Sequence, residues 1–171
     1  MLLGYFFQAT LAYHIAIMNV APNIALAFCA VVAVGLGRKY VFLMSLIIGY
    51  LLELTLQTVS FFNIILYPIS AMLAAFAFSD KSKRVLDEEQ IFNEKIKIQL
   101  PALIRTPLCV LVSIMFFELI HFAYIYLNGV DIEREHYTRI LISFAYTTIL
   151  TIIIQFPLRW FLGLHRVKKA S

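Results

Sequence analysis

The sequence has few charged residues. Only 14% of its 171 residues are Asp, Glu, Lys or Arg, whereas about 25% are charged in an average soluble domain. Hydrophobic residues make up 62% of the chain, compared with about 45–50% in such a domain. A soluble domain of this length could not bury so much apolar surface. The composition predicts an all-α integral membrane protein with a single transmembrane domain over residues 1–171, because the apolar runs are continuous and do not alternate as barrel strands do.

Cysteines and catalytic motifs are also scarce. Cys29 and Cys109 lie far apart in apolar runs, which is typical of small buried side chains. The 4 histidines are dispersed, and the sequence contains no HExxH, no GxSxG and no phosphate-binding glycine loop. We therefore predict a protein that is not an enzyme and has no cofactor or metal. The net charge of +4 does not indicate nucleic-acid binding, since membrane proteins concentrate Lys and Arg on their cytoplasmic side.

Six apolar runs are candidates for crossing a bilayer, which takes about 20 residues. They are Leu2–Val20, Ile24–Leu36, Tyr40–Val59, Phe61–Phe78, Ala102–Leu127 and Ile140–Leu164. We predict a bundle of six transmembrane helices. The second run is short, so a tilted or partly inserted helix is an alternative for that run. For the whole chain, the alternative to six spans is five.

The positive charges predict the orientation of this bundle. With the amino terminus inside, 12 of the 14 Lys and Arg residues fall on the inner side, and only Arg134 and Arg139 fall outside. Both termini are therefore predicted to be cytoplasmic. Residues 80–100 then form an inner segment, either an amphipathic helix on the membrane or a solvated loop. The outer loop over residues 128–138 is either a contact for a partner or a solvated turn, and Arg134 within it and Arg139 just after it are the possible outer contacts.

Two carboxylates lie within the predicted spans, where a charge costs about 2.5–3.5 kcal/mol. Glu53 and Glu118 each lie about 20 Å along their helices from an inner basic residue. Gln57 shares a face with Glu53, and His121 shares a face with Glu118. Such groups can form a proton- or cation-coupled transport site, or an outward ligand pocket. In the structural interpretation, they pair with His121, Arg134 or Arg139 or form hydrogen bonds across helices.

Short motifs follow one another in a characteristic order. Pro22-Asn23-Ile24 opens the second run, Gly35-Leu36-Gly37-Arg38-Lys39 closes it, and Gly49-Tyr50-Leu51-Leu52-Glu53 lies in the third; Asn63, Tyr67 and Phe156-Pro157-Leu158-Arg159 follow. This order resembles MreD, a family of rod-shape-determining membrane proteins of bacteria. Two departures stand out: Asn23 replaces the family's usual acid, and the turn over Thr58–Phe62 lacks its Gly and Pro.

The resemblance implies a non-catalytic subunit of the cell-elongation complex in the bacterial cytoplasmic membrane, which helps to regulate peptidoglycan synthesis and cell shape. Its partners would be MreC and, through it, RodA, a penicillin-binding transpeptidase and MreB, besides membrane lipids. The family resembles in fold the S subunits of energy-coupling-factor transporters, so a vitamin- or small-molecule-binding S subunit is the alternative function. The residues expected to have structural or interface roles are Glu53, Gln57, Asn63, Tyr67, Glu118 and His121.

Overall fold

The computed structural model describes residues 2–18, 20–56, 61–78, 100–129 and 134–163, and most of them are helical. The elements are α1 (Leu2–Phe6), the π-helical turn η1 (Phe7–Leu11), α2 (Ala12–His14), α3 (Ile24–Gly35), α4 (Arg38–Leu56), α5 (Phe62–Phe78), α7 (Ala102–Leu127) and α8 (Arg134–Phe161). No strand occurs within these described ranges. The predicted all-α class is confirmed.

The helix bounds follow the predicted apolar runs closely in the middle of the chain. The helix predicted over Ala102–Leu127 has those ends in α7, and α3 and α5 each differ from their runs by one residue. Helix α8 starts at Arg134, earlier than the predicted Ile140. Hydropathy marks where a helix becomes apolar, not where its backbone becomes helical, and Glu135 in the first turn suits the helix dipole.

The first run differs more from its prediction as one span over Leu2–Val20. Its helical part ends at His14 and contains the turn η1. Beyond it the chain folds back, because Ile17 and Val20 exchange backbone hydrogen bonds of 3.1 and 2.9 Å. Met18 has a φ of 52°, in the left-handed region. The expected single helix is thus replaced by a shorter helix and a turn.

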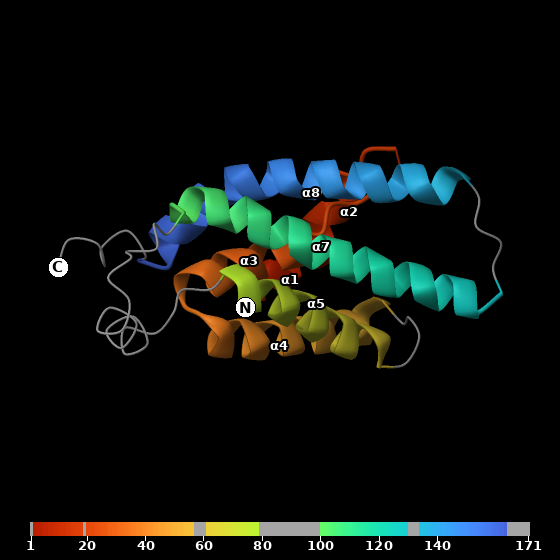
Figure 1. The fold of residues 1–171 in the computed structure, drawn as a ribbon, viewed down its shortest axis with the longest axis horizontal. Helices are drawn as coiled ribbons and strands as arrows, with labels where there is room; N and C mark the ends of the chain where they lie inside the picture. The colour runs from red at the N-terminus through yellow and green to blue at the C-terminus, as the bar shows by residue number, and fades with distance from the viewer. Residues whose placement is uncertain (1, 19, 57–60, 79–99, 130–133, 164–171) are drawn as a thin grey trace, which may run out of the picture.

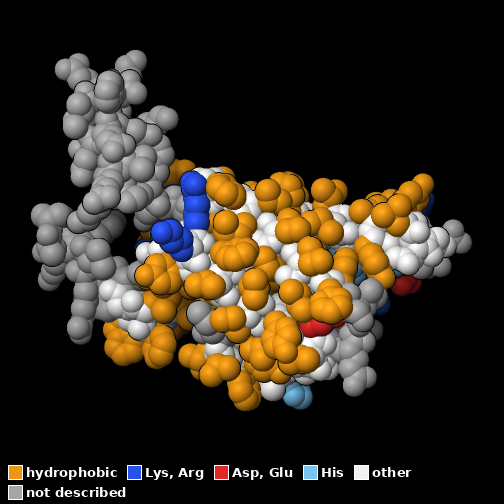
Figure 2. All heavy atoms as spheres, turned by 90° about the horizontal axis from the view of Figure 1, so that it is seen from below, with side chains coloured by type: hydrophobic (Ala, Val, Ile, Leu, Met, Phe, Trp, Pro, Cys, Tyr) orange, Lys and Arg blue, Asp and Glu red, His pale blue; other side chains and the backbone are white. Residues whose placement is uncertain are grey.

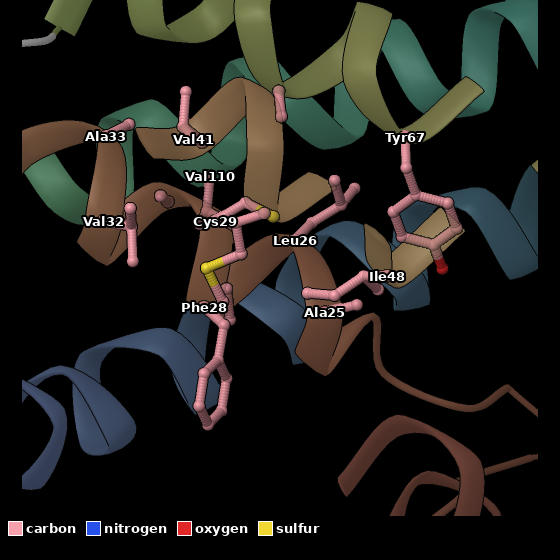
Figure 3. Packing of buried hydrophobic residues seen from close by; sticks show 14 of the residues in the cluster. Ala25, Leu26, Phe28, Cys29, Val32, Ala33, Val41, Ile48, Tyr67 and Val110 are labelled. Atoms are coloured by element: carbon pink, nitrogen blue, oxygen red, sulfur yellow. The ribbon is translucent and has the colours of Figure 1, made fainter. Parts of the chain in front are cut away.

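Helix α3 forms the centre of the molecule. Every residue of α3 from Ile24 to Val34 is buried, and α3 contacts α4, α5, α7 and α8. Figure 1 shows α3 between the pair α7 and α8 and the pair α4 and α5. Its small side chains, such as Ala27 and Ala33, allow close approach by neighbouring helices. Figure 3 shows Val41, Ile48, Tyr67 and Val110 around its apolar side chains.

The outer surface of the bundle is strongly apolar. Leu54, Ile65, Leu119 and Ile153 are among the large hydrophobic side chains that are exposed on four different helices. Figure 2 shows hydrophobic side chains over most of the described surface in that view, with the most prominent Lys and Arg side chains toward the left. Helices α7 and α8 are long and apolar enough to cross a membrane, and only 22% of the apolar window in each is buried. This exposure is unlike that of a soluble protein's core helix.

Some predictions concern parts of the chain outside the described residues. Gln57 lies there, and so does the segment predicted over residues 80–100, apart from Leu100. The basic tail after Gly163 lies there as well. These predictions stay as they were made from the sequence.

Candidate functional site

Helices α4 and α5 meet at a close backbone contact, which we call the α4–α5 corner (Gly49, Glu53 and Asn63). A Cβ atom at Gly49 would lie 2.6 Å from the backbone oxygen of Asn63, so only glycine fits. One turn further along α4, the Oε2 atom of half-buried Glu53 accepts a hydrogen bond of 2.9 Å from the Asn63 N–H. That N–H belongs to the first turn of α5, which has no intrahelical acceptor for it. Glu53 thus caps α5 across the hairpin, where a negative charge is favourable.

Asn23 joins α3 to two other helices. Its backbone N–H donates to the Thr147 hydroxyl of α8 at 3.0 Å. Its Oδ1 atom accepts from the Leu26 N–H at 3.1 Å and from the Tyr67 hydroxyl at 3.4 Å. Because Asn is a favoured N-cap, this position could be expected from sequence to start a helix. Its bonds to α5 and α8 carry no sequence signal.

The buried start of α3 is completed by a side chain from the π-helical turn. The Oε1 atom of Gln8 accepts a hydrogen bond of 3.1 Å from the Ala25 N–H. The N–H groups of Ile24 and Ala27 donate to the backbone oxygens of Pro22 and Asn23. All four N–H groups from Ile24 to Ala27 therefore have acceptors, which matters because an unpaired amide in an apolar medium costs several kcal/mol.

Glu118 makes the corresponding contact between α7 and α8. Its Oε1 atom accepts a hydrogen bond of 2.9 Å from the Ser143 hydroxyl, and its side chain is half-buried. Each of the two predicted carboxylates thus bonds to a neutral donor on the next helix. Arg139, Ser143 and Thr147 are spaced by four residues, so they share one face of α8.

A cleft of about 680 Å³ brings several predicted residues together between α5, α7, α8 and the amino-terminal segment. Of the predicted site residues, it is lined by Asn63, Tyr67, Glu118, His121 and Arg139. Glu53 and Arg134 are not part of its lining. Glu53 instead holds the first turn of α5, whose Asn63 lines the cleft. Arg134 is the exposed first residue of α8.

Sequence reasoning missed other residues that line the cleft. Among them are Gln8, Tyr13, Asn23, His136 and Ser143. Gln8 and Ser143 carry no motif, and their roles come from the helices that meet them. His136 stands in the polar loop predicted as a possible outer contact, and its Nδ1 atom is buried without a hydrogen-bond partner.

Aromatic rings form one wall of this cleft. The ring centroids of Phe62 and Tyr124 are 4.6 Å apart, and those of Tyr67 and Phe117 are 5.1 Å apart. His121 lies 6.0 Å from Phe62 and 6.4 Å from Phe117. These distances are typical of favourable edge-to-face and tilted packing. The cleft thus combines one carboxylate, one guanidinium and an aromatic wall, a set of groups suited to binding.

Within the described ranges, no three His, Cys, Asp or Glu side chains lie close enough together to hold a metal ion. Comparisons of the chain with protein-family models, with characterised proteins and with solved structures found no match.

Proposed function

We propose that this chain is a non-catalytic, multi-pass subunit of the bacterial cytoplasmic membrane that acts in the cell-elongation complex. In this role it binds MreC and, through it, RodA, a penicillin-binding transpeptidase and MreB. It thereby helps to regulate peptidoglycan synthesis and cell shape. The six apolar segments cross the membrane with both termini in the cytoplasm.

One observation carries this proposal. The polar and glycine residues by which the sequence resembles MreD are far apart in the chain, yet they are joined in space. Glu53 and Gly49 both contact Asn63, and Tyr67 contacts Asn23. Asn63 and Tyr67 are one turn apart on α5. Four residues that match the family, Gly49, Glu53, Asn63 and Tyr67, thus form one chain of contacts across α4 and α5, which Asn23 extends to α3 at the position of the family's usual acid. This arrangement supports a common origin for the pattern.

The membrane location is supported by the surface of the bundle. The exposed faces of α4, α5, α7 and α8 carry large hydrophobic side chains, which lipid covers in the proposed arrangement (Figure 2). Arg38 at the start of α4 donates to the Phe76 backbone oxygen near the end of α5, at 3.2 Å, and lies over the Phe76 ring. Both ends lie on the predicted inner side, where basic residues gather.

Partner binding then uses a rigid frame. The contacts of Glu53 and Asn23 hold three helices around α3, so the outward faces of the bundle keep one shape. MreC's membrane segment packs laterally on such a face. Through this contact, the outer domain of MreC is coupled to this chain's cytoplasmic segment over residues 80–100. Preorganised faces of this kind bind with less ordering cost than mobile ones.

Affinity purification from native membranes tests the proposal. The tagged full-length chain is expressed from its own locus, and co-purifying proteins are quantified against an unrelated multi-pass protein with the same tag. We expect MreC to be enriched, with RodA and the transpeptidase at lower ratios. Absence of these proteins from the purified material, when the chain itself is recovered intact, contradicts the elongation role.

The cleft favours a second candidate, a substrate-binding S subunit of a vitamin or small-molecule transporter. Ligand pockets usually measure about 300–1,000 Å³ and combine apolar walls with a few polar groups, and the cleft of about 680 Å³ has this character. The same purification separates the two functions. Enrichment of transporter ATPase subunits without MreC supports the S subunit.

A further inference from the structure

We propose that the cleft and a neighbouring apolar groove form one binding site for a zwitterionic phospholipid with a primary ammonium headgroup, of the phosphatidylethanolamine type. The ammonium binds Glu118, the phosphate binds Arg139, and an acyl chain lies in the groove. The inference requires the membrane location proposed above, but it does not depend on which partner proteins the chain binds.

The charges of the cleft match such a headgroup. Glu118 uses one carboxylate oxygen to accept from Ser143. Arg139 lies about one turn before Ser143 on the same face of α8, so its Cα lies about 6 Å along the axis from that of the serine that holds the carboxylate, and both Arg139 and Glu118 line the cleft. In the ethanolamine headgroup a two-carbon linker separates the ammonium from the phosphate. One acidic and one basic side chain in the same cleft therefore suit a zwitterion better than a simple anion or cation.

The aromatic wall favours the ammonium end of the lipid. Phe62, Tyr124 and Phe117 present rings along the cleft on the side of Glu118 and His121. Ring faces attract cations, and aromatic residues are enriched at the level of lipid headgroups. These rings and Glu118 act on the same part of the ligand.

The apolar groove lies directly beside the cleft, between α5 and α7. It has a volume of about 230 Å³ and is lined by Phe61, Ile65, Ile69 and Ile120, together with Phe62, Leu66 and Tyr124. The last three also line the cleft, so the two hollows adjoin at those side chains. A ligand that uses both hollows needs a zwitterionic head and a hydrocarbon tail, and this requirement identifies a phospholipid.

The nature of the polar contacts selects among phospholipids. A carboxylate is best satisfied by N–H donors, which the ethanolamine ammonium has and the choline group lacks. Phosphatidylglycerol has no cation for Glu118. We therefore expect the site to prefer phosphatidylethanolamine over phosphatidylcholine and phosphatidylglycerol.

Native mass spectrometry of the intact chain measures this preference. The purified protein is exposed to equal amounts of the three lipids, and the retained molecules are counted. A hydrogen bond to a charged group is worth about ten- to a hundredfold in affinity, so Glu118→Gln should lower phosphatidylethanolamine retention by about that factor. Glutamine keeps an acceptor for Ser143, so folding is preserved. Arg139→Gln should weaken all three lipids, and Glu135→Gln, an exposed acid outside the cleft, is the matched control and should change nothing.

A second pair of variants tests the groove. Ile65→Trp fills the groove and should reduce lipid retention, whereas Leu141→Trp, on an exposed position of α8, should not. Soluble glycerophosphoethanolamine and inorganic phosphate serve as competitors and should displace the lipid poorly, because they lack the acyl chain. Equal retention of the three lipids, or equal effects of Glu118→Gln and Glu135→Gln, would overturn the proposal. Full displacement by glycerophosphoethanolamine or by phosphate would overturn the lipid assignment in favour of a soluble ligand, and a peptide retained in place of lipid would assign the cleft to a protein partner.

Discussion

Replacing Gly49 by alanine should destabilise the bundle, because two backbones touch at this position. The new Cβ would lie 2.6 Å from the Asn63 oxygen and 3.2 Å from both the Asn63 carbonyl carbon and the Ile64 Cα. All three are backbone atoms, so no side-chain rotation can relieve the overlap. Ordinary van der Waals contact begins at 3.4 Å, so α4 and α5 must separate by roughly 0.8 Å, the difference between these two distances. That movement also stretches the hydrogen bond from Asn63 to Glu53.

The size of the effect follows from two opposing contributions. Overpacking of a well-filled contact costs about 1–3 kcal/mol, and the rigid backbone places this case in the upper part of that range. Alanine is a better helix former than glycine by about 1 kcal/mol. The overlap therefore outweighs the helix preference, and we expect a net loss of about 1–2 kcal/mol in the free energy of unfolding.

Thermal unfolding of the protein in detergent or nanodiscs measures this loss. For a chain of this size the midpoint should fall by about 2–8 °C. Gly4→Ala is the matched control, because the three atoms nearest to its new Cβ all belong to the Phe28 side chain and none lies closer than 3.2 Å, so the overlap is smaller than at Gly49. A Gly49→Ala protein that unfolds at or above the temperature of the Gly4→Ala protein would refute the role given to the close contact.

Three further predictions use the same unfolding assay. Glu53→Ala leaves the Asn63 N–H without its acceptor and should cost about 1–3 kcal/mol, whereas Glu53→Gln keeps an acceptor oxygen and should cost less; equal losses would show that the cap is unimportant. Asn23→Ala removes the α3 cap and the acceptor of Tyr67 and should cost about 1–3 kcal/mol, while Asn23→Asp, which keeps both acceptor positions, should unfold near the parent temperature. Phe61 is 67% exposed and has a φ of 65°, so Phe61→Gly should raise the free energy of unfolding by up to about 1 kcal/mol, and a clear loss would contradict strain at this turn.

The helices could be predicted well, since continuous apolar runs leave few alternatives. Helix α7 has the predicted ends, because Pro101 precedes it and Asn128-Gly129 follows it. The prediction of a single helix for the first run was wrong, because the run is apolar throughout and nothing in its hydropathy indicates the turn in which Ile17 and Val20 pair.

The candidate site was predicted in part. Glu53 and Glu118 stand out because acids are rare in apolar runs, and this signal is independent of the fold. Their partners, the Asn63 N–H and the Ser143 hydroxyl, depend on how neighbouring helices cross. The spacing rule that grouped His121 with Glu118 works within a helix, and no such rule connects residues on different helices.

The sequence alone determined the all-α class, the segments that become helices and the rare acids among them, because these depend on local composition and on the spacing of apolar residues. Only the tertiary structure decided that α3 is enclosed on all sides, that Glu53 supports α5 instead of lining the cleft, and that Asn23 joins three helices. The reason is physical: side chains far apart in sequence acquire partners only when packing brings their helices within hydrogen-bonding distance.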